Sequence, residues 1–334
     1  MTDHITIAID AMGGENSPDK TIEGISHHLK KSNNTFYLIF GNEKLIKPLI
    51  KKYKIDSDKY KIVHTEKNIE DTDTALGAAK KGKDTSLWLA MESLKKGDSD
   101  CVVSAGNTGA LSVIAKLNLE MITNIDKPAL SALWPNKNGM SVVLDLGANA
   151  ECNSENLLDF AVMGSTYYKV LYPQIDTKVA LLNIGSEELK GNNLIQETHE
   201  LMKSDKRINY QGFVEADEIT STNNHVIVTD GFSGNIALKT AEGVSKFITD
   251  SLKKSLTSTS FSKILSLLLK KNFKDFKNLI DPRNYNGRMF IGVNGIVTKS
   301  HGNADSHSFA NAIDFGVRCI DYDLLNEIKK NVSR

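Results

Sequence analysis

A lysine, a histidine and a carboxylate stand close together near the end of the sequence, at Lys299, His301 and Asp305. A cation and an imidazole beside Gly302 suit a bound phosphate or a developing oxyanion, and an imidazole exchanges a proton near neutral pH. An isolated histidine is more often structural, but the neighbouring charges favour function. We therefore predict catalytic roles for Lys299 and His301.

A second candidate anion site is the segment 104–110 (SAGNTGA). It follows an apolar run and opens a helical pattern, where unpaired N–H groups and the helix dipole favour a phosphate. Small residues let the backbone approach an anion, and Asn107 and Thr108 can add donors. A lone turn of this kind can need glycine for its conformation only. The predicted phosphate-binding residues are Ser104, Gly106, Asn107, Thr108, Gly109, Lys299 and Gly302.

Similar glycine turns follow four more apolar runs. Six of their residues are expected to shape a crevice, namely Asp10, Gly13, Gly14, Asp145, Asn149 and Asp230. Asn235 is the third candidate catalytic residue. Lys190 could hold an acidic partner or the phosphate, although a surface lysine is usually only solvated.

Several other chemistries lack support in the sequence. No glycine turn matches GxGxxG or GxxxxGK[ST], which argues against nicotinamide and P-loop nucleotide binding. The turns at Asp10 and Asp145 superficially resemble the phosphate loops of sugar kinases, but a helical pattern follows the first of them where a hairpin is required. The eight histidines show no paired ligand spacing, so no metal is expected. Cys152 has no histidine nearby in the sequence and is expected to be a buried small residue.

The elements that must position these residues are six apolar, β-branched runs, at 5–10, 101–104, 141–145, 179–183, 226–230 and 295–299. Weaker strand patterns occupy 35–40 and 61–64. Helical patterns alternate with them at 19–31, 73–95, 109–123, 156–171, 193–204 and 236–256. Such alternation predicts an α/β fold with a mostly parallel sheet, whose glycine turns gather at the carboxyl ends of the strands. We expect all six turns along one edge.

Bulk properties are those of a globular protein. The 334 residues are 40% hydrophobic and 25% charged, with 41 basic and 41 acidic residues, so no global field attracts nucleic acid. The three cysteines form no CxxC pair, and the N-terminus carries no signal sequence, which predicts a cytoplasmic protein. No apolar stretch approaches the length of a membrane span. We expect one domain over 1–334.

One segment departs from the strand and helix alternation. From 243 to 280 the sequence predicts a helical hairpin inserted in the domain and projecting from the sheet, with apolar residues that include Phe261, Leu265 and Leu268. Because the segment is basic, we expect it to bind an anionic membrane surface. A dimer contact, or a core helix with a solvated basic face, is the alternative.

The motifs together resemble those of bacterial phosphate acyltransferases of the PlsX type, over nearly the whole chain. The matching segments are 10–14 (DAMGG), 103–110 (VSAGNTGA), 144–149 (LDLGAN) with 160–164 (FAVMG), 183–191 (NIGSEELKG), 230–235 (DGFSGN) with 238–240 (LKT), and 299–302 (KSHG). Glu15 and Glu151 stand where that family mostly has aspartate, and each keeps the carboxylate on a longer stem.

The resemblance implies a homodimer with a Rossmann-like α/β/α sandwich related to phosphotransacetylases. It implies conversion of acyl carrier protein thioester and inorganic phosphate to acyl phosphate, which passes to a membrane glycerol-3-phosphate acyltransferase in phospholipid synthesis. No cofactor is expected, because the phosphopantetheine arrives with the carrier protein. Lys190 then becomes a candidate carrier contact. The expected location is the cytoplasm, with peripheral association to the membrane.

Two other functions remain open at this point. A phosphotransacetylase acting on a coenzyme A thioester would share the sheet and the phosphate site. A non-catalytic scaffold that recruits lipid-synthesis enzymes to the membrane would use the hairpin and tolerate substitution of Lys299 and His301.

Overall fold

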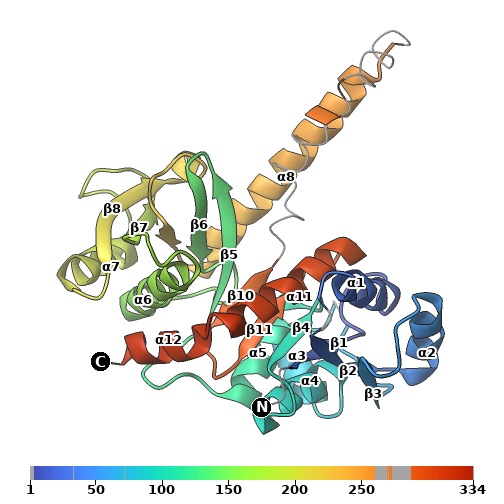
Figure 1. Ribbon diagram of the computed structural model, residues 1–334. Coiled ribbons are helices and arrows are strands. Elements are labelled where there is room, and N and C mark those ends of the chain that lie inside the picture. Colours follow the sequence, from blue (N-terminus) through green and yellow to red (C-terminus); the bar gives the residue numbers. More distant parts are fainter. Residues whose placement is uncertain are drawn as a thin grey trace.

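The computed structural model describes residues 4–333, apart from Asn33, Asp71, 260–268, Lys270 and 273–286. Within these residues the chain forms one mixed sheet of 11 strands with helices on both faces (Figure 1). The strands lie in the order β3 (Tyr60–His64), β2 (Thr35–Gly41), β1 (Ile5–Asp10), β4 (Cys101–Ser104), β11 (Ile296–Lys299), β10 (Arg288–Ile291), β5 (Ala129–Asn136), β6 (Gly139–Leu144), β9 (Val226–Val228), β7 (Lys178–Asn183) and β8 (Asn209–Glu215).

The helices follow the strands along the chain. They are α1 (Asp19–Leu29), α2 (Glu43–Lys52), α3 (Ala75–Lys81), α4 (Ser86–Lys96), α5 (Thr108–Leu119), α6 (Ser154–Leu171), α7 (Asn193–Ser204), α8 (Gly231–Leu256), α11 (Ser306–Asp321) and α12 (Leu324–Val332), with a short 3₁₀ turn at Ala216–Glu218. The helical pattern at 73–95 is two helices, because Thr85 caps a new helix by accepting from the Trp88 N–H.

Alternation along the strands builds a separate core on each face of the sheet. In β1, Ile7 and Ile9 pack on one side with Ile22 of α1, whereas Ala8 packs on the other with Met91 of α4. Because both faces are covered, β4, β9 and β11 are buried along their whole length and β1 along most of it, as their continuous apolar runs predict. The fold is therefore an α/β sandwich, and the predicted fold class is confirmed.

The two halves of the sheet run in opposite directions. β1, β4 and β11 are parallel to one another, and β6, β9 and β7 are parallel to one another. Between them, β10 and β5 form three successive antiparallel pairings, which reverse the direction of the second half. The expectation that all six glycine turns share one edge is therefore wrong.

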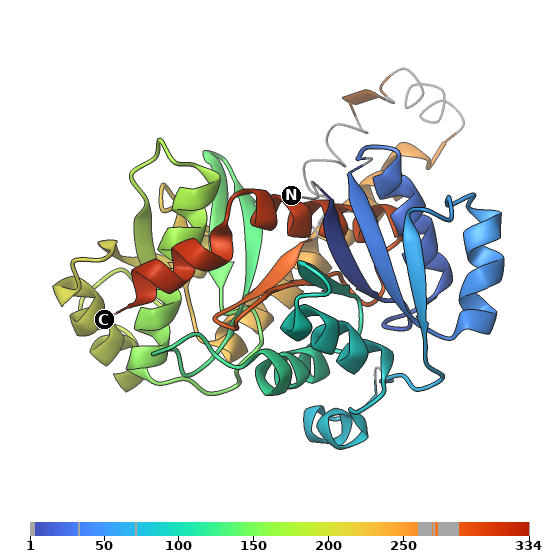
Figure 2. The ribbon, with the colours of Figure 1, turned by 60° about the horizontal axis from the view of Figure 1, so that its bottom comes forward.

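An offset between the halves nevertheless brings their carboxyl ends together. Arg288 at the start of β10 pairs with Lys299 at the end of β11. After β6, the Leu146 N–H donates to the carbonyl of Leu130, which itself pairs with Phe290, so β6 ends close to the level at which β11 ends. Figure 2 shows the two halves side by side, bridged by the C-terminal helices in red. The turns after β4, β6 and β11 consequently face one another.

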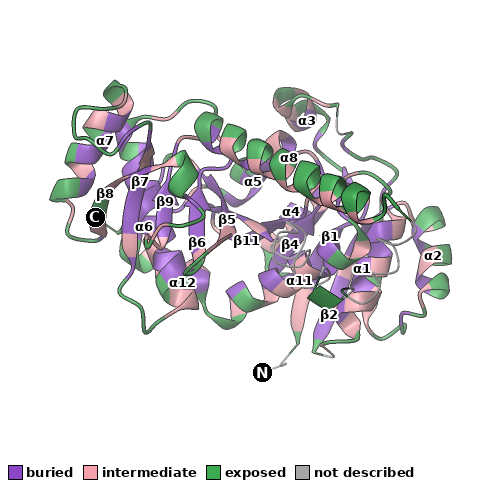
Figure 3. Cartoon of the chain, turned by 90° about the horizontal axis from the view of Figure 1, so that it is seen from above, coloured by how far each residue is buried: buried purple, intermediate pink, exposed green. Residues whose placement is uncertain are grey.

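Helix α8 starts at this junction and projects away from the body (Figure 1). It begins at Gly231, five residues before the predicted helix, because Asp230 caps it. It continues without a break through 243, where the hairpin was expected to begin. Only Gly231, Gly234 and Leu238 are buried, and most of its length is exposed (Figure 3). The three hairpin residues Phe261, Leu265 and Leu268 lie outside the described residues.

Candidate active site

A pocket of about 330 Å³ lies between the facing carboxyl ends of the two half-sheets. Its lining comes from both halves and consists of Glu15, Gly106, Asn107, Thr108, Leu130, Leu146, Gly147, Asn235, Lys239, Arg288, Lys299, His301, Gly302 and Asn303. The structure thus brings together seven of the predicted site residues, namely Gly106, Asn107, Thr108, Asn235, Lys299, His301 and Gly302. The other predicted residues lie behind or outside this lining.

The turn between β4 and α5 presents a helix N-terminus to the pocket. Asn107 is the N-cap, since its Oδ1 accepts from the Ala110 N–H at 3.0 Å, and its Nδ2 donates to the Asp73 carbonyl at 3.3 Å. The side chain of Asn107 therefore organises the turn, and the backbone N–H groups of the first helical turn supply the anion-binding character. Gly109 lies against Ala75 of α3 and does not line the pocket.

Ser104 and Asp10 form a buried support beneath this turn. The Ser104 hydroxyl donates to Asp10 Oδ2 at 2.7 Å and accepts from the Gly106 N–H at 3.0 Å. The Ser86 hydroxyl donates to Asp10 Oδ1 at 2.6 Å. Burial raises the pKa of Asp10, although these hydrogen bonds and the charge of Lys299 act in the opposite direction. Ser104 thus shapes the phosphate turn from behind, as Asp10 does.

Gly13 and Gly14 let the turn after β1 pack directly on the neighbouring turns. A Cβ at Gly13 would lie 2.6 Å from the Gly106 nitrogen, and one at Gly14 would lie 2.6 Å from the Ala105 carbonyl oxygen. Gly14 also has a positive φ of 81°. A side chain at either position would displace the phosphate turn.

Asp145 fixes the turn after β6 through five hydrogen bonds. Its Oδ1 accepts from the N–H groups of Leu130, Gly147 and Ala148, and its Oδ2 accepts from the N–H and the side-chain amide of Asn149, all within 3.1 Å. Burial raises the pKa of Asp145, and these donors lower it in part. Asn149 also donates to the Pro128 carbonyl at 2.6 Å. Both residues shape the crevice, as expected.

Asp230 brings Asn235 to the pocket by starting α8. Its Oδ1 accepts from the Ser233 N–H at 2.9 Å, so the helix axis is set at the end of β9. A Cβ at Gly147 would approach Asn235 Cβ to 3.2 Å, which shows how closely α8 packs on the β6 turn. Asn235 lines the pocket next to this contact.

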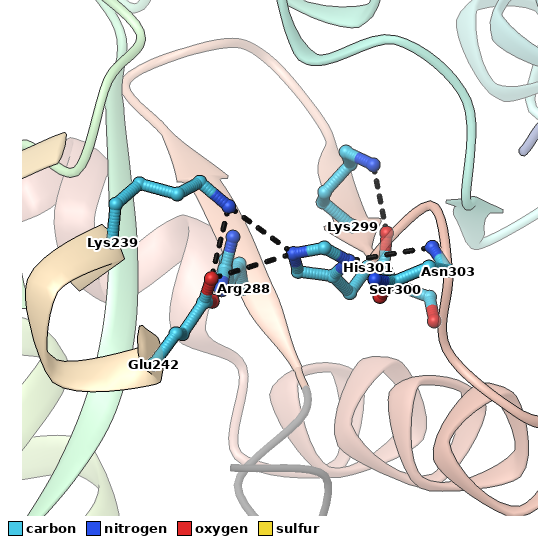
Figure 4. Close-up of polar contacts among 7 residues, drawn as sticks. All are labelled: Lys239, Glu242, Arg288, Lys299, Ser300, His301 and Asn303. Atoms are coloured by element: carbon cyan, nitrogen blue, oxygen red, sulfur yellow. Dashed lines mark hydrogen bonds and ion pairs between the residues drawn. The ribbon is translucent and has the colours of Figure 1, made fainter. Parts of the chain in front are cut away.

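Lys299 and His301 lie at the end of β11, opposite α8 (Figure 4). Lys299 is only 3% exposed, and its Nζ donates to the Ser300 carbonyl at 2.8 Å. The His301 ring is partly exposed, and its Nδ1 accepts from the Asn303 N–H at 3.3 Å. A desolvated ammonium and an oriented imidazole therefore share one wall of the pocket.

A carboxylate on α8 that sequence reasoning missed joins three basic groups at this site. Glu242 Oε1 lies 2.6 Å from Arg288 Nη2, and its Oε2 lies 2.9 Å from Lys239 Nζ and 3.6 Å from His301 Nε2 (Figure 4). Burial would raise the pKa of Glu242, but the hydrogen bonds from His301 and Lys239 and the charge of Arg288 outweigh it and hold that pKa well below its usual range.

Helical spacing was the available signal for part of this cluster. Asn235, Lys239 and Glu242 stand at i, i+4 and i+7, which places them on one face of a helix that begins at a glycine turn. Arg288 carried no comparable signal. It meets Glu242 only because β10 enters the sheet beside β11.

Two further residues considered in the sequence, Lys190 and Cys152, lie outside the pocket lining. Lys190 is half exposed in the loop after β7, with its Nζ 3.9 Å from Glu187 Oε1, and its role as a carrier contact stays a prediction. Cys152 is partly buried, and burial raises the pKa of its thiol to about 11. A thiol with that pKa is protonated at neutral pH and is a poor nucleophile.

Comparison with known proteins places the chain among enzymes of lipid metabolism. A family model described as "Fatty acid synthesis protein" matches residues 5–326. The phosphate acyltransferase of Pelagibacter ubique (strain HTCC1062) is 52% identical over 334 residues, covering 99% of this chain and 100% of the relative. The phosphate acyltransferase of Maricaulis maris (strain MCS10) is 39% identical, covering 100% of this chain and 96% of the relative.

Solved structures share the fold at low sequence identity. A phosphotransacetylase from Streptococcus pyogenes superposes with a TM-score of 0.63 at 15% identity, covering 95% of this chain and 94% of that one. The EutD phosphotransacetylase from Staphylococcus aureus gives a TM-score of 0.60 at 14% identity, covering 98% and 94%. The predicted structural relation to phosphotransacetylases is confirmed.

Proposed function

Because this chain belongs to the phosphate acyltransferase family of fatty acid synthesis proteins, and so is an acyltransferase, we propose that its acyl donor is acyl carrier protein. The acyl group passes from the carrier thioester to inorganic phosphate, which yields acyl phosphate and free carrier protein. The acyl phosphate then enters phospholipid synthesis on the route to phosphatidic acid.

The observation that supports phosphate as the acyl acceptor is the charge of the pocket. Three cationic side chains, Lys239, Arg288 and Lys299, line it beside the N-terminus of α5. Basic side chains and a helix N-terminus are the groups that proteins use to bind phosphate. A pocket of about 330 Å³ has room for a phosphate together with the end of a thioester.

The reaction needs little covalent participation from the protein. A phosphate oxygen attacks the thioester carbonyl carbon and forms a tetrahedral oxyanion, whose collapse breaks the C–S bond. The thiol that leaves has a pKa of about 8.5, so it departs readily as thiolate and then takes up a proton. Catalysis therefore consists of positioning the two reactants and stabilising the oxyanion.

The positions of the lining residues suggest a role for each wall of the pocket. Lys299 and the α5 turn hold the phosphate, because Lys299 pairs with Ser104 at the start of that turn and its ammonium is desolvated. His301 stabilises the oxyanion or protonates the leaving thiolate, since its ring lies at the pocket wall. Asn235 lies across the pocket on α8 and can orient the thioester through its amide.

Phosphate-dependent release of thiol from acyl carrier protein tests the proposal. The full chain is incubated with acyl carrier protein with and without inorganic phosphate, and free thiol and acyl phosphate are both measured. We expect equal amounts of the two products, and none without phosphate. No acyl-enzyme should form when labelled acyl carrier protein is supplied alone, and stoichiometric labelling of Cys152 would overturn this mechanism.

A second candidate donor is acyl coenzyme A, as in a phosphotransacetylase. The shared fold supports it, because solved phosphotransacetylases superpose on nearly the whole of this chain. Rates measured with carrier-protein and coenzyme A thioesters at equal concentration separate the two. A higher rate with the coenzyme A thioester would replace our proposal. A non-catalytic scaffold would instead retain its cellular function in the Lys299→Ala, His301→Ala double variant.

The proposed partners follow from the reaction. They are acyl carrier protein, inorganic phosphate, a second copy of the chain, a membrane glycerol-3-phosphate acyltransferase and an anionic membrane surface, with no cofactor and no nucleic acid. In the part of the chain that the structure describes, no helix is long and apolar enough to cross a membrane. From the proposed reaction, whose product passes to a membrane enzyme, we propose that the chain acts in the cytoplasm at the membrane surface.

A further inference from the structure

Glu242 does not line the pocket, yet it contacts three residues that do. Its carboxylate joins Lys239 of the same helix, Arg288 at the start of β10 and His301 after β11. Its side chain is 20% exposed, so these contacts are largely shielded from water. A single carboxylate thus ties α8 to both strands that form the opposite wall.

The hydrogen bonds around His301 determine where its proton lies. The backbone N–H of Asn303 can only donate, so His301 Nδ1 must accept from it. In the neutral ring the proton is then on Nε2, and the carboxylate of Glu242 is the anion that faces it, with Oε2 3.6 Å from Nε2, an electrostatic contact longer than a hydrogen bond. The Lys239 ammonium lies 3.3 Å from Nε2 and can only donate, so this contact by itself favours an unprotonated Nε2. Nδ1, however, already accepts from the Asn303 N–H, a neutral ring carries one proton, and Glu242 holds the ammonium at 2.9 Å.

We infer that Glu242 is a positioning residue, which holds the His301 ring in its Nε2–H tautomer and fixes the Lys239 ammonium beside it. The effect of Glu242 on catalysis rests on the proposed function. The tautomer of His301 does not depend on that function. A carboxylate that orients an imidazole through one ring nitrogen is a recurring arrangement in acyl transfer. Here the carboxylate is supplied by the projecting helix.

Two further features support a positioning role over a structural one. The pKa of Glu242 is held low, so the carboxylate stays ionised wherever the enzyme works. Its partners are all pocket residues, whereas a carboxylate serving only the fold has no reason to gather the cations of a phosphate site. The geometry also means that Glu242 moves with α8, which is one continuous helix of 26 residues.

The test compares Glu242→Gln with the parent and with a matched control. Glutamine keeps the shape but removes the charge and places an amide against the cations. Glu43→Gln is the control, because Glu43 is also a helical glutamate that pairs with a lysine, at 2.7 Å, on the surface away from the pocket. Glu242→Asp keeps the charge on a shorter stem and should recover part of the loss.

Two measurements are made on each full-length variant. Nitrogen NMR of ¹⁵N-histidine protein reports the His301 tautomer, assigned with His301→Ala, and the phosphate-dependent thiol assay reports kcat and KM. We expect the Nε2–H signature in the parent and in Glu43→Gln, and its loss in Glu242→Gln. The kcat/KM of Glu242→Gln should fall on the order of 10- to 100-fold, because small misplacements of catalytic groups have effects of that size.

Each remaining outcome also decides the question. An unchanged His301 signature in folded Glu242→Gln overturns the inference, whatever the activity. If Glu242→Gln has a normal kcat/KM but a changed His301 signature, the tautomer of His301 has no effect on catalysis. A parent enzyme that shows the signature but makes no acyl phosphate refutes the proposed function and leaves the positioning of His301 standing.

Discussion

Replacement of Lys299 by methionine should abolish most of the activity and leave the fold intact. The Lys299 side chain is 3% exposed, so its ammonium is desolvated and solvent cannot substitute for it. Methionine fills the volume of the apolar stem and removes only the charge. The substitution therefore isolates the electrostatic contribution of this residue.

The expected magnitude follows from what remains in the pocket. Loss of one preorganised donor to an oxyanion typically costs about 2.7 to 4 kcal/mol, a factor of roughly 100 to 1,000 in kcat. Lys239 and Arg288 still line the pocket and attract phosphate, so binding weakens less than turnover does. We expect kcat to fall on the order of 100-fold or more, with a rise of roughly 10-fold in the KM for phosphate.

The assay is phosphate-dependent thiol release over a range of phosphate concentrations, with circular dichroism and thermal unfolding of each protein. Lys203→Met serves as the control, because Lys203 is an exposed lysine paired with Glu188 at 3.7 Å. His301→Ala should give a loss of similar size. Near-normal rates in folded Lys299→Met and His301→Ala would show that the site assignment is wrong.

Three further predictions concern the turn after β6, the absence of an acyl-enzyme and the pH dependence of stability. Asp145→Asn removes the acceptor of the two hydrogen bonds made by Asn149 and should lower the free energy of unfolding by roughly 3 to 6 kcal/mol, measured by urea denaturation. Cys152→Ser should keep kcat within about twofold, because burial raises the pKa of the thiol to about 11 and no acyl-enzyme is needed; a large loss in the thiol-release assay would count against this. Burial lowers the pKa of His28 to about 4, so the histidine is neutral in both the folded and the unfolded chain above pH 6.5, and its contribution to stability is fully present there. As the pH falls towards 4, only the unfolded chain takes up the proton, and the free energy of unfolding should decrease by up to about 3 kcal/mol. Urea denaturation at several pH values should show a weaker pH dependence for His28→Gln.

Much of the fold was predictable because its central strands are buried on both faces. The apolar runs that became β1, β4, β6, β7, β9 and β11 needed no periodicity to be recognised. The strands that were missed, β5, β8 and β10, differ in kind. β8 has one buried residue, Val214. β5 contains Trp134 and Pro135, and its second half is only partly buried, so it lacks the continuous apolar run. β10 is four residues long and follows a stretch without strand signals.

The direction of the second half-sheet was not readable from the sequence. It depends on β5 and β10 pairing antiparallel with their neighbours, which is a long-range choice between strands that the sequence does not mark. The glycine turns still converge because the halves are offset. Gly106 and Lys299 are neighbours for the predicted reason, because β4 and β11 are parallel. Gly147 and Asn235 meet them from the half that runs in the opposite direction, for which the predicted sheet was incorrect.

Long-range pairing of elements also explains why sequence reasoning missed Glu242 and Arg288. Lys299, His301 and the 104–110 turn are local motifs, and a motif can be recognised without knowing what it faces. Glu242 and Arg288 are 46 residues apart and are ordinary surface types in the sequence. Only the path of α8 across the end of β10 turns them into one cluster.

The exposed length of α8 leads to a prediction about the membrane. Its outer half carries exposed apolar side chains, including Phe247 at 72% exposure, with Val244 and Ile248 beside it. Residues 253–280 hold seven lysines and one aspartate in a chain that is neutral overall. Anionic lipid attracts such a segment by roughly 1 kcal/mol for each basic residue near the surface, and apolar side chains can then enter the headgroup boundary.

Vesicle co-sedimentation at low and high salt tests this association. We expect binding that requires anionic lipid, weakens with salt and is lost in the Leu265→Glu, Leu268→Glu double variant, while Leu117→Glu, at an exposed leucine of α5, leaves it unchanged. Since α8 carries Asn235, Lys239 and Glu242, a membrane that holds its outer end also holds one wall of the pocket. Acyl phosphate would then leave beside the surface where a membrane enzyme consumes it. Binding that ignores both lipid charge and the leucine substitutions, in folded dimeric protein, would exclude the membrane role and leave the segment as oligomer structure.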